Sequence, residues 1–414
     1  MSGRIQAPRG TFDVLPAQAS ERAEVEAVAR RVLERAGYGR IETPTFEATE
    51  LFSRGVGEST DVVQKEMYSF HDGGFTLRPE GTAPVCRAYV EHGMHKLPQP
   101  VRLWYLSTFF RHEAPQAGRF RQFWQVGAEA LGSDDPAIDA ESILLLAELL
   151  EEIGARGLRL RLASLGTPET RLSYRAELAA YLRSHEEQLS PEVRARIALN
   201  PLRAFDSDDP GTQAVMANAP LLIDRLTASD AEHFQEVRDL LDDCDLVYDV
   251  DPTLVRGLDY YSRTVFEFTS SELGAQSGVG GGGRYDGLVE MIGGPPTPGC
   301  GWAAGVERIL LASDHPAVAP PPVDLFVAYS DTKYRRPAFS IAAEARRARL
   351  AAQVELAGRS LKGQLKQADR IGARFVAIVS EDGTLLKDME SGEQTLVQGS
   401  VVAMVLRGRG GAGL

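Results

Sequence analysis

Cysteine is scarce in this chain. Its 414 residues include three cysteines, Cys86, Cys244 and Cys300, and no C-x-x-C pair. An odd number of widely separated cysteines argues against a disulfide framework and against a structural zinc site. The composition therefore fits a reducing compartment, and we expect the protein to be cytoplasmic.

Long apolar runs are also absent. No run approaches the ~18 to 20 residues that a membrane helix needs. The N-terminal residues MSGRIQAPRG contain basic side chains but no following apolar stretch of the kind found in secretory signals. We therefore expect neither a membrane segment nor a targeting segment.

An excess of basic charge is the third absence. The chain has 45 Lys and Arg residues against 58 Asp and Glu residues, a net charge of −13 at pH 7. This balance argues against a surface covered with nucleic-acid-binding charge, although it leaves room for a local basic patch. Hydrophobic residues make up 43% and charged residues 25% of the chain, as in ordinary globular proteins, and the length predicts two or three domains.

The charge is divided unevenly along the chain. Residues 323–414 hold 14 Lys and Arg and 10 Asp and Glu, a net of +4, so residues 1–322 carry a net of −17. The prolines at 320–322 predict a linker before the basic tail, because they cannot continue a helix. Beyond them, apolar strand-like segments alternate with helical segments near 335–349 and 361–371. This pattern predicts a small α/β domain on a mostly parallel sheet.

The acidic body divides further. The segment at about 167–252 holds 8 Lys and Arg against 18 Asp and Glu and has helical leucine and alanine periods, so it is predicted to be a helical insertion. Segments rich in strands and glycine, 101–130 and 254–311, flank it. Nearer the N-terminus, apolar residues at helical spacing predict a helix with Ser20 as its N-cap and Gly37 as its end.

Arginine clusters around a turn in the first of these flanking segments. Arg111 precedes a Pro-Gln-Ala-Gly turn, and Arg119 and Arg121 follow it. A strand, turn and strand would fold Arg111 back toward the other two. Guanidinium groups that converge on one cleft, with Phe123 available for stacking, suit a polyphosphate nucleotide. The alternative is a solvated hairpin whose ion pairs lie on its outer face.

A glycine-rich segment, GVGGGGRYDGLVEMIGG at 278–294, follows the strand-like LVRGLDYYSRTVFEF at 254–268. Gly278, Gly280 and Gly283 form a G-x-G-x-x-G pattern, so a dinucleotide fold must be considered. The acidic ribose partner expected about twenty residues later is missing, and no βαβ unit encloses the pattern. We interpret the glycines as room for the backbone to approach a substrate closely.

Two further groups of residues are candidate sites. In TLRPEGTAP, residues 76–84, a carboxylate at Glu80 could receive an ammonium group, whereas the alternative is a turn with a buried ion pair. The histidines lack metal-ligand spacing, and no residues complete a Ser/His/Asp set, so no metal site made of protein ligand clusters is expected. These histidines are His71, His92, His95 and His112.

Several motifs together resemble a class II aminoacyl-tRNA synthetase. RIETPTFE at 40–47, with Pro44, resembles motif 1; FRHE at 110–113 with RFRQF at 119–123 resembles motif 2; GVERILL at 305–311 resembles motif 3. RGTFDVLP at 9–16 is similar to the N-terminal signature of one family in this class, the histidyl-tRNA synthetases. RGLDYY at 256–261 and GGRYDGL at 282–288 resemble the two histidine-specific signatures of that family.

The resemblance implies a fold and two reactions. The fold is an α+β catalytic domain on an antiparallel sheet, residues 1–322, with the helical insertion at about 167–252, followed by a C-terminal α/β anticodon-binding domain at 323–414. The reactions are the activation of L-histidine by ATP, with Mg²⁺ bound to the ATP phosphates, and transfer of the histidyl group to the 3′ end of tRNA(His). Motif 1 implies a homodimer.

The resemblance also implies a role for each matching residue. For ATP, Arg111 lies at the α-phosphate, Glu113 and Phe123 at the adenine, and Arg119, Arg121 and Arg308 toward the β- and γ-phosphates. For histidine, Glu80, Thr82 and Gln125 lie near the ammonium, and Glu129, Tyr261 and Tyr285 surround the imidazole. Arg256 lies beside the histidine carboxylate and the α-phosphate, where it supplies the fixed cation that stabilises charge developing at phosphorus. Arg256 and Arg111 are therefore the expected catalytic residues.

Contacts to tRNA are expected from Gln116 and from the basic tail. Residues 333–374 carry a net charge of +8, and the helical spacing of Arg359, Lys362, Lys366 and Arg370 predicts a basic helix face. The alternative is a solvated helix that only balances the acidic body. The insertion is acidic, so either a basic stripe at Arg194, Arg196 and Arg203 meets the acceptor stem or the insertion touches RNA little. Ala114 departs from the motif 2 pattern, in which many relatives carry a basic residue.

Two rival functions fit parts of the same pattern. One is a non-catalytic paralogue that regulates ATP phosphoribosyltransferase; such proteins typically lack the C-terminal domain and catalytic arginines, and this chain keeps both. The other is a module that senses uncharged tRNA without charging it. The intact signatures favour the enzyme over both rivals.

Overall fold

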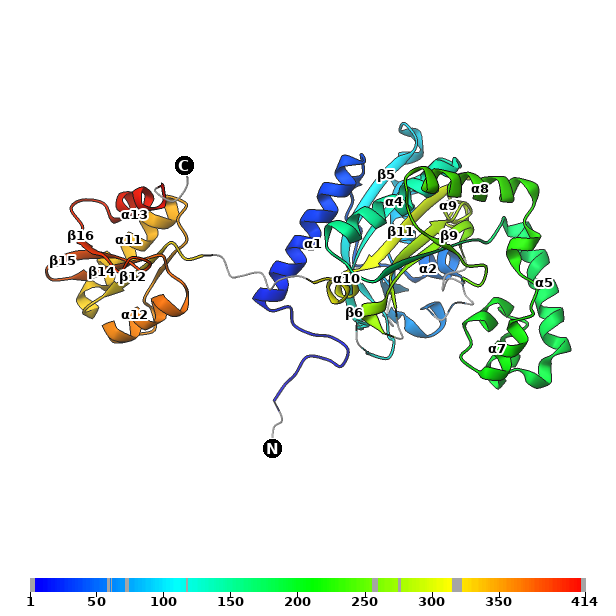
Figure 1. Ribbon diagram of the computed structural model, residues 1–414, viewed down its shortest axis with the longest axis horizontal. Coiled ribbons are helices and arrows are strands. Elements are labelled where there is room, and N and C mark those ends of the chain that lie inside the picture. The colour runs from blue at the N-terminus through cyan, green and yellow to red at the C-terminus, as the bar shows by residue number, and fades with distance from the viewer. Residues whose placement is uncertain are drawn as a thin grey trace. The chain divides into compact units, whose positions relative to one another are not determined.

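The computed structural model describes residues 4–57, 60, 62–70, 74–116, 118–254, 260–274, 277–314 and 322–410. The chain forms two compact units, Met1–Ala317 and Val318–Leu414. Each unit has its own sheet and its own core (Figure 1). Arg256 and His71, both considered above, lie outside the described residues.

Unit 1 is built on an eight-stranded sheet in the order β1-β5-β6-β11-β10-β9-β7-β8. The strands from β5 to β7 in this order are antiparallel, and the two short edge strands pair in parallel. In this order the strands are Gly39–Arg40, Val101–Phe110, Gln122–Leu131, Gly299–Gly305, Gly278–Arg284, Ser262–Ser270, Leu158–Ser164 and Asp249–Val250. The predicted hairpin at 101–130 is therefore β5 and β6.

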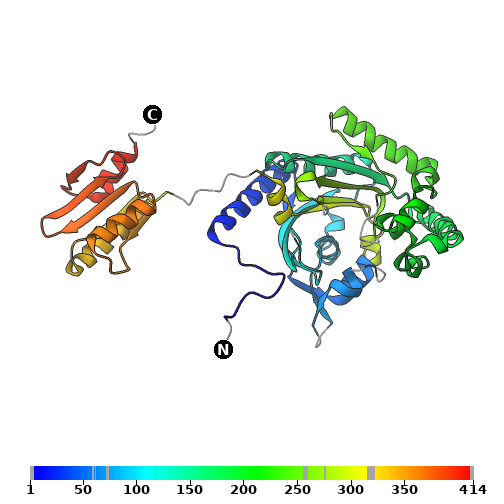
Figure 2. The same cartoon turned by 60° about the horizontal axis from the view of Figure 1, so that its bottom comes forward.

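Helices cover both faces of this sheet. One face packs against α1 (Pro16–Arg35), α4 (Pro136–Glu152), α8 (Ala228–Asp243) and α10 (Val306–Ala312) around buried Trp104 and Trp302. The other face packs against α2 (Thr49–Val56), α3 (Thr82–Glu91) and α9 (Leu288–Met291) around Tyr105 and Tyr285. The second face carries the candidate site, and we call it the site face; the first is the helix face. Figure 2 shows the sheet curving around the elements of the site face.

The segment predicted as a helical insertion contains α5 (Pro168–Ser184), α6 (Pro191–Arg196), α7 (Pro210–Met216) and α8, joined by short 3₁₀ turns. These helices lie together on one side of unit 1 in both views (Figures 1 and 2). A small separate sheet, β2-β4-β3, consists of Phe46–Ala48, Phe75–Leu77 and Tyr68–Ser69. No helix among the described residues combines the length and the apolar character that a membrane crossing requires.

The first helix begins earlier than predicted. Ser20 was expected as its N-cap, but α1 starts at Pro16, and the Ser20 hydroxyl donates to the carbonyl oxygen of Pro16 inside the helix. Proline is well suited to a first helical position because its φ is preset and it needs no N–H partner there. The predicted end is right: Gly37 has a φ of +82°, and the N–H of Tyr38 donates to the Leu33 carbonyl at 3.0 Å.

Unit 2 is a five-stranded sheet in the order β13-β12-β14-β15-β16. The first three strands in this order, Ala352–Val354, Leu325–Tyr329 and Phe375–Ser380, are parallel, and Gly383–Asp388 and Gln394–Leu396 continue antiparallel. One core holds side chains of α11 (Arg335–Arg347) and α13 (Val401–Gly410), and the other holds side chains of α12 (Leu361–Arg370). The expected α/β arrangement is present, with an antiparallel hairpin added at one edge.

The glycine-rich segment is strand β10, and its glycines serve a purpose that differs from the interpretation above. A Cβ at Gly280 would lie 2.6 Å from the Ala304 Cβ, and a Cβ at Gly282 would lie 2.7 Å from the Trp302 Cβ. Both neighbours belong to the paired strand β11 and lie in the core of the helix face. These glycines therefore make room for a neighbouring strand, and the interpretation that they admit a substrate is wrong at these two positions.

Candidate active site

Strand β6 supplies the centre of the candidate site. Side chains alternate between the two faces of a strand, so Phe123, Gln125 and Glu129 share the site face of the sheet. Gly127, between them, faces Tyr105 on β5, and a Cβ there would lie 2.4 Å from the Tyr105 hydroxyl. On the neighbouring strand β11, Gly301 pairs with Glu129, and a Cβ at Gly301 would lie 1.9 Å from Glu129 Oε2. The glycines at 127 and 301 therefore create the space that Tyr105 and the Glu129 carboxylate occupy.

Glu129 is fully buried and accepts hydrogen bonds from three hydroxyl groups. Tyr285 donates to Oε2 at 2.6 Å, and Thr82 and Tyr105 donate to Oε1 at 2.8 and 3.3 Å. Burial raises the pKa of the Glu129 carboxyl to about 8, opposed by these hydrogen bonds and reinforced by the nearby Glu80. A buried carboxylate with perturbed ionisation and convergent donors is typical of a functional site.

Glu80 is the second buried carboxylate. It lies at the start of α3 and accepts from the backbone N–H of Thr82 at 2.7 Å and of Ala83 at 3.1 Å. Burial raises its pKa to about 7, against the lowering effect of those hydrogen bonds and of Arg111. Arg78 donates instead to the carbonyl oxygens of Thr43 and Thr108. The buried ion pair considered for this turn is therefore not the arrangement in the described structure.

Three tyrosines pack together beside Glu129. The ring centroid of Tyr260 lies 4.8 Å from that of Tyr261 and 5.8 Å from that of Tyr285, and all three side chains are buried. Tyr261 and Tyr285 were predicted from the sequence, whereas Tyr260 and Tyr105 were not. The tyrosine doublet at 260–261 was visible, but which member faces the site depends on the turn before β9. Tyr105 could have been found only from its cross-strand pairing with Gly127.

Gln125 offers an acceptor to this site. Its Oε1 is buried and has no hydrogen-bond partner among the described residues. A buried acceptor of this kind costs about 1 to 3 kcal/mol unless a partner is supplied. A ligand with N–H donors would supply that partner.

The arginines gather at the turn end of the same hairpin. Arg111 donates from Nε to the Pro79 carbonyl at 2.9 Å, and its guanidinium lies 5.3 Å from the Phe123 ring centroid. The backbone N–H of Arg111 bonds to the carbonyl of Arg121 at 3.0 Å, which confirms the predicted return of the hairpin.

A second cation lies close to this hairpin. Arg308, at the start of α10, donates to the carbonyl of Gly278. Burial lowers the pKa of Arg308, and the positive charge of Arg119 lowers it further. Arg119 Nη1 lies 3.5 Å from Glu113 Oε2. The structure thus brings Arg119 and Arg308 close together, and Arg119 also forms an ion pair with Glu113, as in the alternative interpretation of a hairpin with ion pairs.

Residues from the N-terminal segment also contact this hairpin. The N–H of Arg121 bonds to the Gly10 carbonyl at 2.7 Å, and Arg121 Nη1 donates to the Arg9 carbonyl at 3.4 Å. Behind the site, Glu307 accepts from the Trp124 N–H at 3.1 Å and from Arg22 Nη2 at 2.5 Å. Glu307 and Arg22 were not predicted, because their contact joins residues 285 positions apart. They tie α1 and α10 to β6.

Other predicted residues lie away from this centre. Gln116 pairs with Arg119 at the tip of the hairpin through two backbone hydrogen bonds of 2.9 and 3.1 Å. Lys362, Lys366 and Arg370 are exposed on α12 of unit 2, at i, i+4 and i+8. Arg359 was expected on the same helix, but it precedes the N-cap Ser360 and pairs with the buried Glu355 at 3.1 Å.

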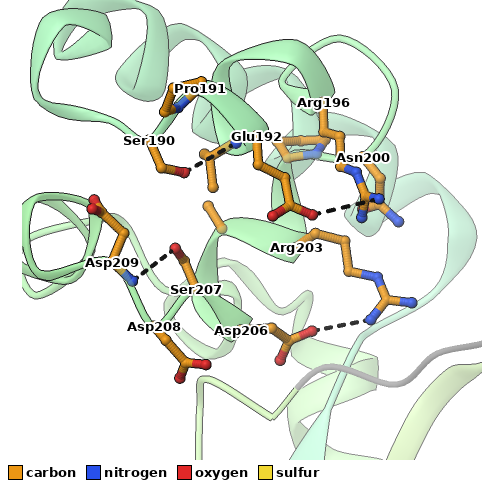
Figure 3. A pocket seen from close by; sticks show the side chains of 13 residues that line it. Ser190, Pro191, Glu192, Arg196, Asn200, Arg203, Asp206, Ser207, Asp208 and Asp209 are labelled. Carbon is orange, nitrogen blue, oxygen red and sulfur yellow. Dashed lines mark hydrogen bonds and ion pairs between the residues drawn. The ribbon is translucent and has the colours of Figure 1, made fainter. Parts of the chain in front are cut away.

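The basic stripe considered for the insertion is paired locally. Arg203 lies 3.1 Å from Asp206, Arg196 lies 3.6 Å from Glu192, and Arg194 donates to the Leu189 carbonyl at 3.0 Å. Arg196 and Arg203 line a cavity of about 550 Å³ that also contains Asp206, Asp208 and Asp209 (Figure 3). Acidic neighbours therefore offset these arginines, which favours the expectation that the insertion touches RNA little.

Comparison with known proteins decides the family. The family model described as histidyl-tRNA synthetase matches residues 10–309. The chain belongs to the histidyl-tRNA synthetase family. It is 47% identical to the histidine–tRNA ligase of Thermosynechococcus vestitus, covering 95% of this chain and 94% of that protein. It is 48% identical to the histidine–tRNA ligase of Halorhodospira halophila, covering 99% of both chains.

Solved structures agree with this assignment. The apo histidyl-tRNA synthetase of S. aureus matches with a TM-score of 0.79 and 32% identity, covering 98% of this chain and 99% of that chain. A Bacillus halodurans chain named as an ATP phosphoribosyltransferase regulatory subunit/histidyl-tRNA synthetase matches with a TM-score of 0.65 and 20% identity, a likeness of fold alone. The predicted family and fold class are confirmed, and the membership favours the enzyme over the regulatory rival.

Proposed function

We propose that this chain is a histidine–tRNA ligase, which activates L-histidine with ATP and transfers the histidyl group to tRNA(His). The observation that carries the proposal is the arrangement around Glu129. Its carboxylate accepts from Tyr285 and Thr82 in a buried site, and arginines gather at the end of the same hairpin. Such a site can hold a small polar amino acid next to a polyphosphate.

Histidine occupies the buried part of this site. Glu129, Tyr261 and Tyr285 surround the imidazole, since a carboxylate and phenol groups can satisfy both ring nitrogens. Glu80, Thr82 and Gln125 hold the ammonium, and the buried Oε1 of Gln125 supports this role. A side chain that cannot make these hydrogen bonds leaves buried polar groups unpaired, so the site discriminates against it.

ATP occupies the arginine-rich end. Arg111 contacts the α-phosphate, Glu113 and Phe123 hold the adenine, and Arg119, Arg121 and Arg308 hold the β- and γ-phosphates. Among the described residues, no three His, Cys, Asp or Glu side chains gather as a metal site. We therefore assign Mg²⁺ to the ATP phosphates, where it offsets their charge. Arg256 is proposed, by family resemblance, to stabilise the charge that develops at the α-phosphorus.

Unit 2 binds tRNA(His) in this proposal. The exposed basic residues of α12, Lys362, Lys366 and Arg370, attract the RNA backbone, and Gln116 contacts the acceptor end. We assign residues 1–322 to the catalytic domain, with the insertion at about 167–252, and residues 323–414 to the anticodon-binding domain. The protein is proposed to act in the cytoplasm.

The chain is also proposed to form a homodimer through the sheet β2-β4-β3. Phe46 is 54% exposed, Phe70 52% and Phe75 46%, and the rings of Phe46 and Phe75 lie 5.9 Å apart. Clustered exposed aromatic side chains mark interaction surfaces. In Phe46→Asp we expect a shift from dimer to monomer by light scattering, whereas Phe339→Asp, at a similarly exposed position of unit 2, should remain a dimer. A dimeric Phe46→Asp variant would contradict this interface.

Adenylate formation is the step that tests the proposed function. Replacing Arg256 with alanine should slow histidine-dependent pyrophosphate exchange by on the order of 10²- to 10³-fold, the effect of losing one preorganised charge-stabilising group. Arg159, an exposed arginine paired with Asp249, provides the control variant Arg159→Ala. Near wild-type exchange in Arg256→Ala would show that the cation comes from elsewhere.

A further inference from the structure

Arg284 and Tyr285 are adjacent at the end of β10, yet they lie on opposite faces of the sheet. Tyr285 reaches Glu129 on the site face. Arg284 pairs across strands with Cys300, which belongs to the core of the helix face, and its guanidinium meets Asp139 of α4. One short piece of backbone therefore carries both a residue of the site and a buried charge on the far side.

Arg284 uses every N–H donor that a guanidinium has. Its side chain is 0% exposed. Nη2 donates to Asp139 Oδ1 at 2.6 Å, and Nε donates to Asp139 Oδ2 at 3.3 Å. The remaining donors meet the carbonyls of Ser133 and Asp135 and the carboxylate of Asp286 at 3.0 to 3.1 Å. Because Asp286 follows Tyr285, the guanidinium holds the turn on both sides of the tyrosine.

Asp139 connects this arginine to the insertion. His233 of α8 lies with Nε2 2.8 Å from Asp139 Oδ2 and with Nδ1 3.3 Å from Arg263 Nη1. Arginine can only donate, so Nδ1 accepts and Nε2 carries the proton that it donates to Asp139. Arg263 also donates to Asp230 of α8 at 3.2 Å. The cluster therefore consists of Asp139, Asp230, His233, Arg263 and Arg284, and all of these except the partly exposed Arg263 are buried.

The second arginine of this cluster, Arg263, follows the adjacent tyrosines Tyr260 and Tyr261. Arg263 lies two residues after Tyr261 and has a φ of +46°, a backbone conformation that residues other than glycine rarely adopt. The surrounding contacts hold this conformation: its N–H bonds to the Gly166 carbonyl and its carbonyl accepts from the Leu165 N–H, both at 2.7 Å. Arg171 of α5 donates to the Tyr261 carbonyl. Strained residues of this kind persist where the surroundings over-determine them.

We propose that Arg284 and Arg263, anchored by Asp139, His233 and Asp230, are positioning residues that set the places of Tyr285 and Tyr261 in the histidine site. The proposal rests on the proposed role of these tyrosines. It makes histidine recognition depend on α8 of the insertion, through side chains that never touch the substrate. ATP is held at the other end of the hairpin and does not depend on this cluster.

The test separates the Michaelis constants of the two substrates in pyrophosphate exchange. Lysine at 284 keeps the charge but has only three donors in a different geometry, so the turn loses two of its anchors. In Arg284→Lys the KM for histidine should rise roughly tenfold, the effect of about 1.4 kcal/mol, whereas the KM for ATP stays within about twofold. Leu149→Ala, which removes a buried side chain of α4 outside the cluster, is the control for lost stability. It should leave both constants unchanged.

Two further measurements keep the proposal testable if Arg284→Lys folds poorly. His233→Ala should also raise the KM for histidine selectively, and His233→Gln should recover much of the loss, because an amide can both donate to Asp139 and accept from Arg263. In a Tyr285→Phe background, Arg284→Lys should raise the KM for histidine by less than about twofold, because no tyrosine hydroxyl is left for Arg284 to position.

Three outcomes would overturn the proposal. The first is an unchanged KM for histidine in both Arg284→Lys and His233→Ala. The second is a parallel rise of the KM values for histidine and ATP in those variants and in Leu149→Ala. The third is that the effects of Arg284→Lys and Tyr285→Phe on the KM for histidine are fully additive. A Tyr285→Phe variant that binds histidine normally would instead contradict the proposed role of Tyr285 itself, so the two failures can be told apart.

Discussion

Tyr285 donates its hydroxyl hydrogen to Glu129 Oε2 at 2.6 Å, and both side chains are buried. The two residues lie 156 positions apart in sequence. Strand β11 lies between their strands, and Gly301 on that strand leaves the space that the carboxylate needs. In the proposed function this contact sets where the histidine side chain is bound, and the first two predictions follow from it.

Glu129→Gln should weaken histidine binding selectively. Glutamine keeps the shape but replaces one acceptor oxygen with a donor, so a buried polar contact to the imidazole is lost and the KM for histidine should rise about 10- to 100-fold, on the scale of about 1 to 3 kcal/mol for a buried polar group left unpaired. The KM for ATP should stay within about twofold. Isothermal titration with histidine alone provides the same comparison without catalysis. If Glu129→Gln binds histidine with wild-type affinity, the imidazole does not bind beside Glu129.

The stability of the substrate-free protein should fall as the pH rises from about 5 to 8. Burial raises the pKa of Glu129 to about 8 and that of Glu80 to about 7, from 4.5. The folded state then binds protons at these two carboxyl groups more tightly than the unfolded chain does. Their contribution to the free energy of unfolding is therefore fully present below pH 4.5 and is lost as the pH rises through the two raised pKa values. Thermal unfolding should show a smaller decline in Glu129→Gln than in the wild type. Equal declines would show that Glu129 does not titrate in this window.

Arg308→Ala should affect ATP and leave histidine binding unchanged. Burial lowers the pKa of Arg308, and the nearby charge of Arg119 lowers it further, so the two guanidinium groups form a paired cationic site suited to phosphate oxygens. The KM for ATP should rise on the order of tenfold or more, as for the loss of one charge-assisted hydrogen bond. Arg159→Ala serves as the surface control. An equal effect on both substrates would argue for a structural role of α10.

Reversal of charge on α12 should weaken binding of tRNA(His) without affecting adenylate formation. In Lys362→Glu/Lys366→Glu, fewer counterions are released on binding, so the salt dependence of the affinity should become shallower. Arg30→Glu/Arg35→Glu on the exposed face of α1 is the matched double reversal. Filter binding at several salt concentrations provides the comparison. If the affinity and its salt dependence are unchanged, α12 is not part of the surface that binds RNA.

Local patterns predicted the elements of this fold well. The hairpin of β5 and β6, the helix ending at Gly37, and the alternation of strands and helices in unit 2 follow from periodicity and from turn residues that act over a few positions. The errors are also local. Ser20 has the side chain of an N-cap, but the helix already begins at Pro16, and Arg359 has the spacing of α12 but precedes its N-cap.

The candidate site was predicted residue by residue through family resemblance, whereas its supporting contacts were not. Tyr105, Tyr260 and Glu307 are single residues without a pattern of their own. Their roles arise from cross-strand pairing and from contacts between distant segments. The buried cluster around Arg284 was missed for the same reason, because the face on which Arg284 lies depends on the shift in strand register between Gly283 and Arg284.

Pyrophosphate exchange measured separately with each of the twenty amino acids tests the central claim most directly. Glu129, Tyr261 and Tyr285 are proposed to be satisfied by an imidazole and by no other side chain, so histidine should support exchange and the other nineteen should support almost none. Comparable exchange with another amino acid would contradict the proposed site. Binding of histidine without exchange by any amino acid would contradict the proposed reaction.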